Sequence, residues 1–413
     1  MRQDIYEPRE DSFMMEKCVL EYSKGCSLVL DMGTGSGILA FAASKHAKQV
    51  LCCDINKNAV EHVLSRIKNE NRKNVFCFES DLFSYLNSFY FDSIKNCFIQ
   101  TDNKNQFDLI IFNAPYLPLD KGTEDAALYG GKVGHEVTER FISNAANYLS
   151  DKGNILLTCS STVGLENIRE IIAKNLMIAK VIDSFHAFFE TVYVLLIKKT
   201  NALVNLHEKG VSEISYYAKG KRGYISLGKF DNKKIAVKVL HKNLNFNRIE
   251  NEVNFLKLLN KKGIGSQLLF YGNDYFAYTF VEGELIVDFI NSSQKFAILD
   301  IIKKILAECY TMDCLGINKL EMHHPIKHII VRKNGNDAVP VMIDFERARF
   351  TKDPKNVTQF FDFLIGDNIS EILSKKEICL RKEYIIPLLK AYKKEMSERN
   401  YNALIAFLEN KIL

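Results

Sequence analysis

Hydrophobic and polar positions follow two alternating patterns along the first 198 residues. Short, continuous apolar runs of the kind that form buried strands recur at CSLVLD (26–31), VLCCD (50–54), FDLIIF (107–112), NILLTCS (154–160) and TVYVLLIKK (191–199). The segment after the second run predicts an amphipathic helix, because its apolar residues follow the i, i+3, i+4, i+7 spacing: Val60, Val63, Leu64 and Ile67. Strands that alternate with helices predict an α/β fold with a mostly parallel, doubly wound sheet. A functional site is then expected at the carboxyl ends of the strands.

The second half of the chain has a different pattern. GVSEISYYAKGKRGYISLGKFDNKKIAVKVL (210–240) reads as three strands with a glycine-containing turn, and a helix is expected over RIENEVNFLKLLNKKGI (248–264). NVTQFFDFLI (356–365) and the stretch to Leu413 predict packing helices. Their apolar spacing favours core positions for Phe360, Phe361 and Phe363.

Length and charge both support two domains. A chain of 413 residues is long for one domain. Residues 1–198 hold 21 Lys+Arg against 25 Asp+Glu, and the remainder holds 34 against 25. This shift predicts a linker over residues 199–212 between domains 1–198 and 213–413. The basic second half is expected either to attract nucleotide phosphates or RNA, or to form an ordinary solvated lysine surface.

The sequence disfavours a membrane or secreted protein, and it disfavours a protein held together by disulfides or zinc. No apolar run approaches the ~18 residues that a membrane span needs, and the first residues do not form a signal peptide. The ten cysteines are scattered without a CxxC pair, which favours reduced thiols over disulfides or a zinc site. We therefore expect a cytoplasmic protein.

The turn DMGTGSG (31–37) follows the first strand and opens a helix. Its glycines allow a backbone to approach a ligand closely, although a generic turn or a dinucleotide site would use them too. Acids at the ends of successive strands favour S-adenosylmethionine, since one of them can accept both ribose hydroxyls. The expected cofactor-binding residues are Asp31, Gly33, Gly35, Gly37, Asp54, Asp81 and Asn113.

A third strand is expected to end in ESDLF (79–83), and the fourth ends in FNAPYLP (112–118), where two prolines stiffen the backbone around one amide, Asn113. An amide nitrogen is a poor nucleophile, so an enzyme that methylates it must fix its orientation. The Asn113 side-chain oxygen and the Ala114 carbonyl can each accept one N–H. Pro115 keeps Ala114 extended, and Tyr116 completes the expected catalytic segment.

This segment resembles the Asn-Pro-Pro-Tyr motif of methyltransferases that act on glutamine or adenine nitrogen. Together with YEPREDSFMM (6–15) and LYGGKVGHEV (128–137), it resembles the archaeal and eukaryotic class of HemK-type methyltransferases over residues 4–198. The resemblance implies a Rossmann-like, seven-stranded class I methyltransferase domain. It also implies methylation of the glutamine in the Gly-Gly-Gln loop of a translation termination factor, with a small zinc-binding activator subunit as partner. Ala114 departs from the family pattern, which has proline there.

The second half resembles small atypical, RIO-like kinases over about residues 213–365, which implies an α+β kinase-like domain that binds ATP and Mg²⁺. IAVKVL supplies the strand lysine, the following helix supplies its acidic partner, and VMIDFE supplies the metal-binding acid: Lys238, Glu252 and Asp344. The loop KLEMHHPIKHIIV (319–331) lacks the Asp and Asn of active kinases. Glu321 or His323 lies where the catalytic acid belongs, and His328 lies where the Asn belongs.

Alternatives remain open at this point. The second half is either an active kinase or a nucleotide-binding or scaffold module. The whole chain could instead be a translation-associated binding protein whose second domain only senses nucleotide. The acceptor of the first half is either glutamine or adenine N6 in RNA or DNA, and its net acidic charge disfavours nucleic acid. A metal site made of the loop histidines is disfavoured, because no Cys or acid at helical spacing completes it.

Overall fold

A computed structural model describes residues 7–100, 104–116, 134–187, 189–220, 223–240, 247–335 and 337–409. The chain forms two compact units, Met1–Tyr216 and Tyr217–Leu413. The division falls inside strand β10 (Ser212–Lys219).

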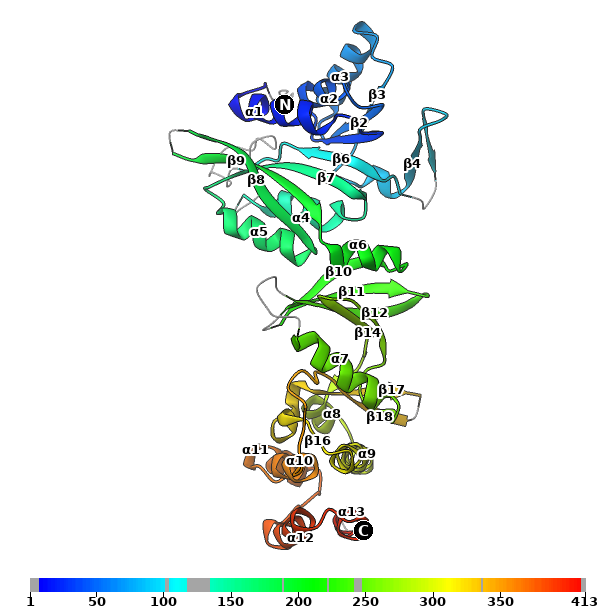
Figure 1. Cartoon of the computed structure of the whole chain (residues 1–413), viewed down its shortest axis with the longest axis vertical. Coiled ribbons are helices and arrows are strands. Elements are labelled where there is room, and N and C mark those ends of the chain that lie inside the picture. The colour runs from blue at the N-terminus through cyan, green and yellow to red at the C-terminus, as the bar shows by residue number, and fades with distance from the viewer. Residues whose placement is uncertain are drawn as a thin grey trace. The chain divides into compact units, whose positions relative to one another are not determined.

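The first unit is built on a seven-stranded sheet in the order β3-β2-β1-β6-β7-β9-β8 (Figure 1). Its strands are β1 (Leu28–Met32), β2 (Gln49–Asp54), β3 (Val75–Glu79), β6 (Phe107–Phe112), β7 (Leu149–Ser160), β8 (Met177–His186) and β9 (Thr191–Lys199). Pairings from β3 through β7 are parallel, and β9 runs antiparallel to both of its neighbours. Strand β1 is buried along its whole length, as expected of a parallel strand covered on both faces. The predicted mostly parallel sheet is confirmed.

Helices cover both faces of this sheet. Figure 1 shows α1 (Glu10–Tyr22), α2 (Ile38–Ala43) and α3 (Lys57–Asn69) on one face, and α4 (Glu136–Ala145) and α5 (Leu165–Lys174) on the other. The predicted apolar face of α3 is right for Val60 and Val63, which are buried, and wrong for Leu64, which is exposed. The buried line of this helix instead includes Ala59, one turn before Val63.

A small hairpin, β4 (Phe89–Asp92) and β5 (Cys97–Gln100), interrupts the order of strands and helices. It carries an aromatic cluster in which the ring of Phe91 lies 5.2 Å from that of Phe98 and 4.7 Å from that of Phe76. The apolar runs above do not predict this insertion.

The segment predicted as a linker contains helix α6 (Asn201–Glu208). Thr200 caps it by accepting a hydrogen bond from the Leu203 N–H. Leu203 and Leu206 are buried, and the neighbouring Lys199 Nζ lies 3.0 Å from Asp151 Oδ1. Much of residues 199–212 is therefore packed structure, which the shift in composition does not indicate.

The second unit begins with a five-stranded sheet in the order β10-β11-β12-β14-β13. Its further strands are β11 (Gly223–Phe230), β12 (Lys233–Leu240), β13 (Leu268–Tyr271) and β14 (Tyr275–Thr279), and the pairings among these four are antiparallel. Helix α7 (Asn247–Asn260) connects β12 to β13 and ends four residues before the expected helix does.

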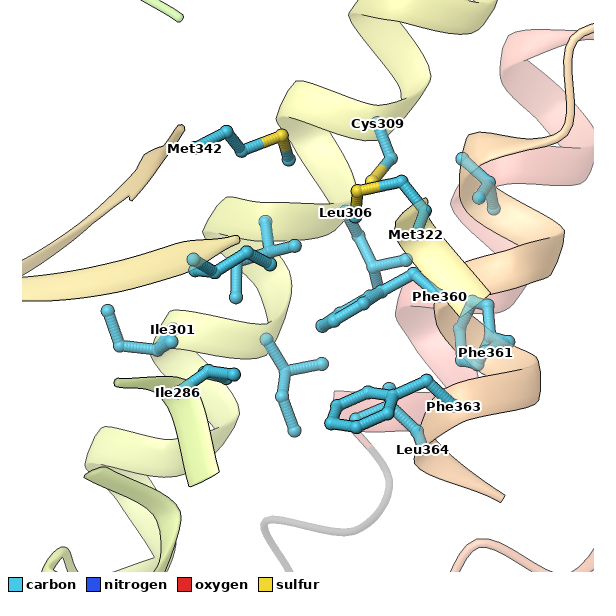
Figure 2. Close-up of a cluster of buried hydrophobic side chains, with 14 of the residues drawn as sticks. Ile286, Ile301, Leu306, Cys309, Met322, Met342, Phe360, Phe361, Phe363 and Leu364 are labelled. Carbon is cyan, nitrogen blue, oxygen red and sulfur yellow. The ribbon is translucent and has the colours of Figure 1, made fainter. Parts of the chain in front are cut away.

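The remainder of this unit is mainly helical. Its helices are α8 (Ile286–Ser292), α9 (Lys295–Cys314), α10 (Asn356–Leu364), α11 (Asp367–Lys375), α12 (Lys382–Lys394) and α13 (Glu398–Glu409). One short strand, β15 (Glu284–Leu285), precedes them, and the others lie between α9 and α10, namely β16 (Ile317–Asn318), β17 (Ile329–Asn334), β18 (Asp337–Met342) and β19 (Arg349–Phe350). Phe360, Phe361 and Phe363 are buried in one cluster with side chains of α9 (Figure 2), so their predicted core role is confirmed.

Among the described residues, no helix is both long enough and apolar enough to cross a bilayer.

Candidate active site

A cavity of about 440 Å³ opens at the carboxyl ends of β1, β2 and β6. The glycine turn, the acid that ends β2, the segment after β6 and the first turn of α1 all contribute to its wall. This is the position at which parallel α/β sheets bind ligands, because several strands end there. A volume of this size falls within the range of small-molecule sites.

The glycine turn divides into two parts with different roles. Gly33 and Gly35 line the cavity, and a Cβ on Gly33 would lie 3.3 Å from the ring of Phe112. Gly37 does not line it. A Cβ there would lie 2.8 Å from Phe41 Cε2 and 3.0 Å from Val63 Cγ2, so this glycine is needed for close packing of α2 and α3 and for its φ of +83°.

Asp31 does not line the cavity, although Thr34, which hydrogen-bonds to it, does. Thr34 Oγ1 donates to its Oδ2 at 2.7 Å, while Oδ1 is buried without a hydrogen-bond partner among the described residues. Burial raises the pKa of Asp31 to about 7. This carboxyl group holds the turn from below.

Asp54 lies on the cavity wall with both of its oxygens fixed by the backbone. Its Oδ2 accepts the Gly35 N–H at 2.9 Å, and its Oδ1 accepts the Asn56 N–H at 2.8 Å. Burial raises the pKa of Asp54 above its usual value, although these backbone hydrogen bonds act in the opposite direction. The remaining lone pairs of the carboxylate are suited to a pair of hydroxyl groups.

Asp81 lines the cavity at a more exposed position. Its Oδ2 accepts from Arg140 Nη2 of α4 at 2.7 Å. Arg140 also lines the cavity. The sequence does not indicate this role, because Arg140 lies 59 positions after Asp81 and only the fold brings the two residues together.

Asn113 lines the same cavity as Gly33 and Gly35, and hydrogen bonds hold both ends of its amide. Its Nδ2 donates to Asp11 Oδ2 at 3.1 Å and to Ser12 Oγ at 3.4 Å. Its Oδ1 accepts from Thr158 Oγ1 at 2.6 Å. Asp11 and Ser12 belong to the segment that resembles the HemK signature, so a signal for them exists in the sequence. Thr158 has no such signal, because the β6–β7 register brings it to Asn113.

The residues after Asn113 continue along the wall. Ala114, Pro115 and Tyr116 all line the cavity, and Ala114 is buried. Leu117, Pro118 and residues 128–133 of the second signature lie outside the described residues. The end of that signature is described, and there Glu136 Oε2 accepts the N–H groups of Gly134 and His135.

In the second unit, Lys238 of β12 lies among three carboxylates. Its Nζ is 2.7 Å from Glu252 Oε2, 3.2 Å from Glu346 Oε2 and 3.6 Å from Asp344 Oδ1. Burial lowers the pKa of Lys238, but the carboxylates of Glu252 and Asp344 outweigh this effect and raise the pKa above its usual value. One carboxylate oxygen from each of the three acids lies within 4.8 Å of the other two, a geometry that can hold a metal ion.

Only some residues of the loop 319–331 lie near the three carboxylates around Lys238. His328 Nδ1 lies 4.0 Å from Asp344 Oδ2, and burial lowers the pKa of His328. Glu321 lies 3.7 Å from Lys319 Nζ, and Lys319 donates to the backbone oxygens of residues 343 and 344. The ring of His323 points elsewhere, with Nδ1 2.9 Å from the Leu320 oxygen. Of the two predicted candidates for the catalytic acid, Glu321 is therefore the one near Asp344. Lys319 and Glu346 also belong to this cluster, although the sequence analysis assigns no role to either.

The cavity of the first unit fits S-adenosylmethionine on its own chemistry. The glycine turn leaves room for a ligand that lies close to the backbone, and the fixed Asp54 carboxylate suits a ribose. The sheet order, with one antiparallel strand, is that of class I methyltransferases. The family profile "Methyltransferase small domain" matches residues 17–188. Fold, site and profile together define an S-adenosylmethionine-dependent methyltransferase domain.

Relatives narrow the class to a family. The chain is 34% identical over 167 residues to a Methanocaldococcus jannaschii protein named as an N5-glutamine methyltransferase, covering 39% of this chain and 75% of that protein. It is 30% identical over 209 residues to human methyltransferase HEMK2, covering 48% of this chain and 91% of that protein. The chain belongs to the family of protein N5-glutamine methyltransferases that includes these proteins.

Solved structures show weaker likenesses. The E. cuniculi Mtq2–Trm112 complex, which methylates the eRF1 translation termination factor, is matched at 22% identity with a TM-score of 0.36, over 48% of this chain and 99% of that one. WbdD bound to a kinase inhibitor is matched at 14% identity with a TM-score of 0.47, over 98% of this chain and 89% of that one. Both scores lie below 0.5.

Proposed function

We propose that the first unit transfers a methyl group to the glutamine side-chain nitrogen in the Gly-Gly-Gln loop of a translation termination factor. The observation that carries this proposal is the position of Asn113. Asn113 lines the same cavity as Gly33, Gly35 and Asp54, directly after the central strand β6. A substrate amide that entered this cavity would therefore meet the Asn113 side chain beside the cofactor site.

S-adenosylmethionine, when bound, supplies an electrophilic methyl group. The role of the chain is to hold the acceptor nitrogen in line with that group. Asn113 Oδ1 accepts one N–H of the glutamine amide, and the Ala114 carbonyl accepts the other. Two acceptors on one NH2 group orient it and increase the electron density on its nitrogen. Pro115 restricts Ala114 to extended backbone, which keeps the second acceptor in place.

The names of the relatives support the choice of substrate. A Streptococcus pneumoniae relative, 27% identical over 174 residues, is a release factor glutamine methyltransferase. A Schizosaccharomyces pombe relative, 25% identical over 198 residues, is the catalytic subunit of an eRF1 methyltransferase. A catalytic subunit works with a partner, so a small zinc-binding activator remains part of the proposal for this chain.

The test is a radiolabelled methyl-transfer assay. Purified chain, with and without the activator, is offered a termination factor that carries either Gln or Asn in its Gly-Gly-Gln loop, beside an RNA control. Label is expected only in the Gln factor. Label in RNA would contradict the proposal and favour an adenine acceptor. Label that persists in the Asn factor would contradict it by showing that another protein residue is methylated.

For the second unit we propose a kinase-like, nucleotide-binding module. The supporting observation is the buried Lys238–Glu252 ion pair with Asp344 beside it, on an antiparallel sheet next to helix α7. Lysine in such a pair binds nucleotide phosphates in kinases, and an acid at the place of Asp344 holds Mg²⁺. Lys238→Ala and Asp344→Ala are expected to abolish ATP binding measured by calorimetry. Unchanged ATP affinity in both variants would refute this assignment.

A further inference from the structure

The order of strands divides the cavity of the first unit into two halves. The sheet runs β3-β2-β1-β6-β7-β9-β8, so the end of β6, which Asn113 follows, lies between two groups of three strands. The residues proposed for the cofactor follow or end strands of the first group: Gly33, Gly35, Asp54 and Asp81. The half beside β7, β9 and β8 is therefore left for the methyl acceptor.

Glu190 brings a carboxylate into this second half. Strand β9 runs antiparallel to β7, and their register pairs Val192 with Ser160. The start of β9 therefore meets the carboxyl end of β7, which brings Glu190 to the same edge of the sheet as Asn113. Glu190 lines the cavity together with three apolar residues of the β8–β9 hairpin: Phe185, Ala187 and Val192.

One oxygen of the Glu190 carboxylate is anchored. Its Oε2 accepts from Ser160 Oγ, and Ser160 is fully buried. Ser160 Oγ is held in turn, because it lies 2.9 Å from Thr162 Oγ1 and accepts the Thr162 N–H at 3.1 Å. The Ala187 N–H donates to the Glu190 carbonyl at 2.8 Å and closes the hairpin. A carboxylate that is already held loses little conformational entropy when a ligand binds.

The other oxygen, Oε1, is the one that remains for a ligand. Within the described part of the chain, it accepts no hydrogen bond, and no basic side chain forms an ion pair with this carboxylate. A carboxylate oxygen only accepts hydrogen bonds. A ligand that covers Glu190 must therefore offer a donor, because a covered carboxylate without one is strongly unfavourable.

The neighbours of Glu190 favour a peptide backbone as the source of that donor. Ala187 is small, and Phe185 and Val192 are apolar, so a segment without bulky side chains can lie against them. The two glycines of a Gly-Gly-Gln loop form such a segment, and their backbone N–H groups are not shielded by side chains. An N–H that faces a carboxylate forms a charge-assisted hydrogen bond.

We propose that Glu190 is a substrate-binding residue whose Oε1 accepts a backbone N–H of the glycine-containing loop that carries the acceptor glutamine. This inference rests on the proposed function and deepens it, because it assigns the acceptor half of the cavity to the β8–β9 hairpin. The glycines of the loop then lie beside β9, and its glutamine extends toward Asn113.

Steady-state kinetics on the Gln-containing termination factor test this role. Glu190→Ala is expected to raise KM for the factor about 10- to 100-fold, the contribution of one hydrogen bond to a charged group. Its kcat and its Kd for S-adenosylmethionine should stay within about twofold of wild type. Glu190→Gln keeps a neutral acceptor of similar shape and should lose less.

Glu166→Gln is the matched control, because it removes an exposed carboxylate that does not line the cavity. Its KM should equal that of wild type. An unchanged KM in Glu190→Ala would overturn the proposal, and so would a loss of cofactor affinity as large as the change in KM.

A second measurement does not depend on methyl transfer. The probe is a capped Gly-Gly-Gln peptide, added with S-adenosylhomocysteine to chain that carries ¹³C at the side-chain carboxyl carbon of Glu. The Glu190 and Glu166 signals are assigned by their disappearance in Glu190→Gln and Glu166→Gln. The peptide is expected to shift the Glu190 signal and to leave the Glu166 signal in place. An analogue with ester oxygens in place of the N–H groups of the second glycine and the glutamine should shift neither.

The outcomes separate this inference from the proposed function. If the wild-type chain does not methylate the termination factor, the proposed function fails, and the Glu190 signal still decides the role of this residue. If the wild-type chain methylates the factor but the peptide leaves the Glu190 signal unshifted, the inference fails and the proposed function stands. An equal shift with the ester analogue would also overturn the inference, because Glu190 would then not accept a backbone N–H.

Discussion

Replacement of Asp54 is the clearest perturbation of the cofactor site. Its two oxygens accept the N–H groups of Gly35 and Asn56 at 2.9 and 2.8 Å, so the carboxylate is rigidly held on the cavity wall. In Asp54→Asn, one oxygen becomes an NH2 group and the negative charge is lost. At most one ribose hydroxyl then keeps its acceptor.

The magnitude follows from the charge and the number of bonds lost. A hydrogen bond to a charged group contributes about 1.5–3 kcal/mol. Loss of one such bond raises the Kd for S-adenosylmethionine about 10- to 150-fold. Because burial raises the pKa of Asp54, affinity in the wild-type chain should also fall as pH drops through this raised pKa and the carboxyl group becomes protonated. The variant should lack that dependence.

Isothermal titration calorimetry at neutral pH measures the effect. Asp92→Asn is the matched control, since Asp92 likewise accepts two backbone N–H groups, from Ile94 and Lys95, but lies away from the cavity. Its Kd should equal that of wild type. If Asp54→Asn is folded and binds within about twofold of wild type, the assignment of Asp54 to the ribose is wrong.

Three further outcomes are expected. Since burial raises the pKa of Asp31 to about 7, the wild-type free energy of unfolding should fall by about 3 kcal/mol between pH 4 and pH 7 relative to Asp31→Asn; parallel urea-denaturation profiles in the two proteins would contradict this. Gly37→Ala should lower the free energy of unfolding by about 2–4 kcal/mol, because the new Cβ would lie 2.8 Å from Phe41 Cε2 on a residue with positive φ. A loss of cofactor affinity without a loss of stability would count against this packing role. Glu346→Gly should tighten ATP binding about tenfold by releasing Lys238 from a carboxylate 3.2 Å away, whereas weaker binding would show that Glu346 supports the site.

Features with a local cause could be predicted from the sequence. The parallel strands appear as continuous apolar runs because both of their faces are covered, and the glycine turn and FNAPY appear at strand ends. Asn113 could be expected on a cavity wall for this reason. The role of each glycine could not be predicted, because close contact with a ligand and close packing of helices both require a residue without a side chain. Gly33 and Gly37 look alike in sequence and differ only in what lies beside them.

The network around the site could not be predicted, because tertiary structure assembles it. Asp11 meets Asn113 across 102 positions, and the β6–β7 register brings Thr158 to the same amide. The same holds in the second unit, where a short 3-10 helix at Leu320–His323 places Glu321 toward Lys319 and turns His323 away. A one-residue difference in such a turn cannot be read from spacing alone.

The central claim is that Asn113 presents an acceptor to a glutamine amide beside the cofactor. Tandem mass spectrometry of the termination factor tests it most directly, after incubation with the chain, its activator and S-adenosylmethionine. One added methyl group is expected on the glutamine of the Gly-Gly-Gln loop with wild-type chain, and none with Asn113→Ala that still binds cofactor. A methyl group on another residue, or full methylation of that glutamine by Asn113→Ala, would contradict the claim.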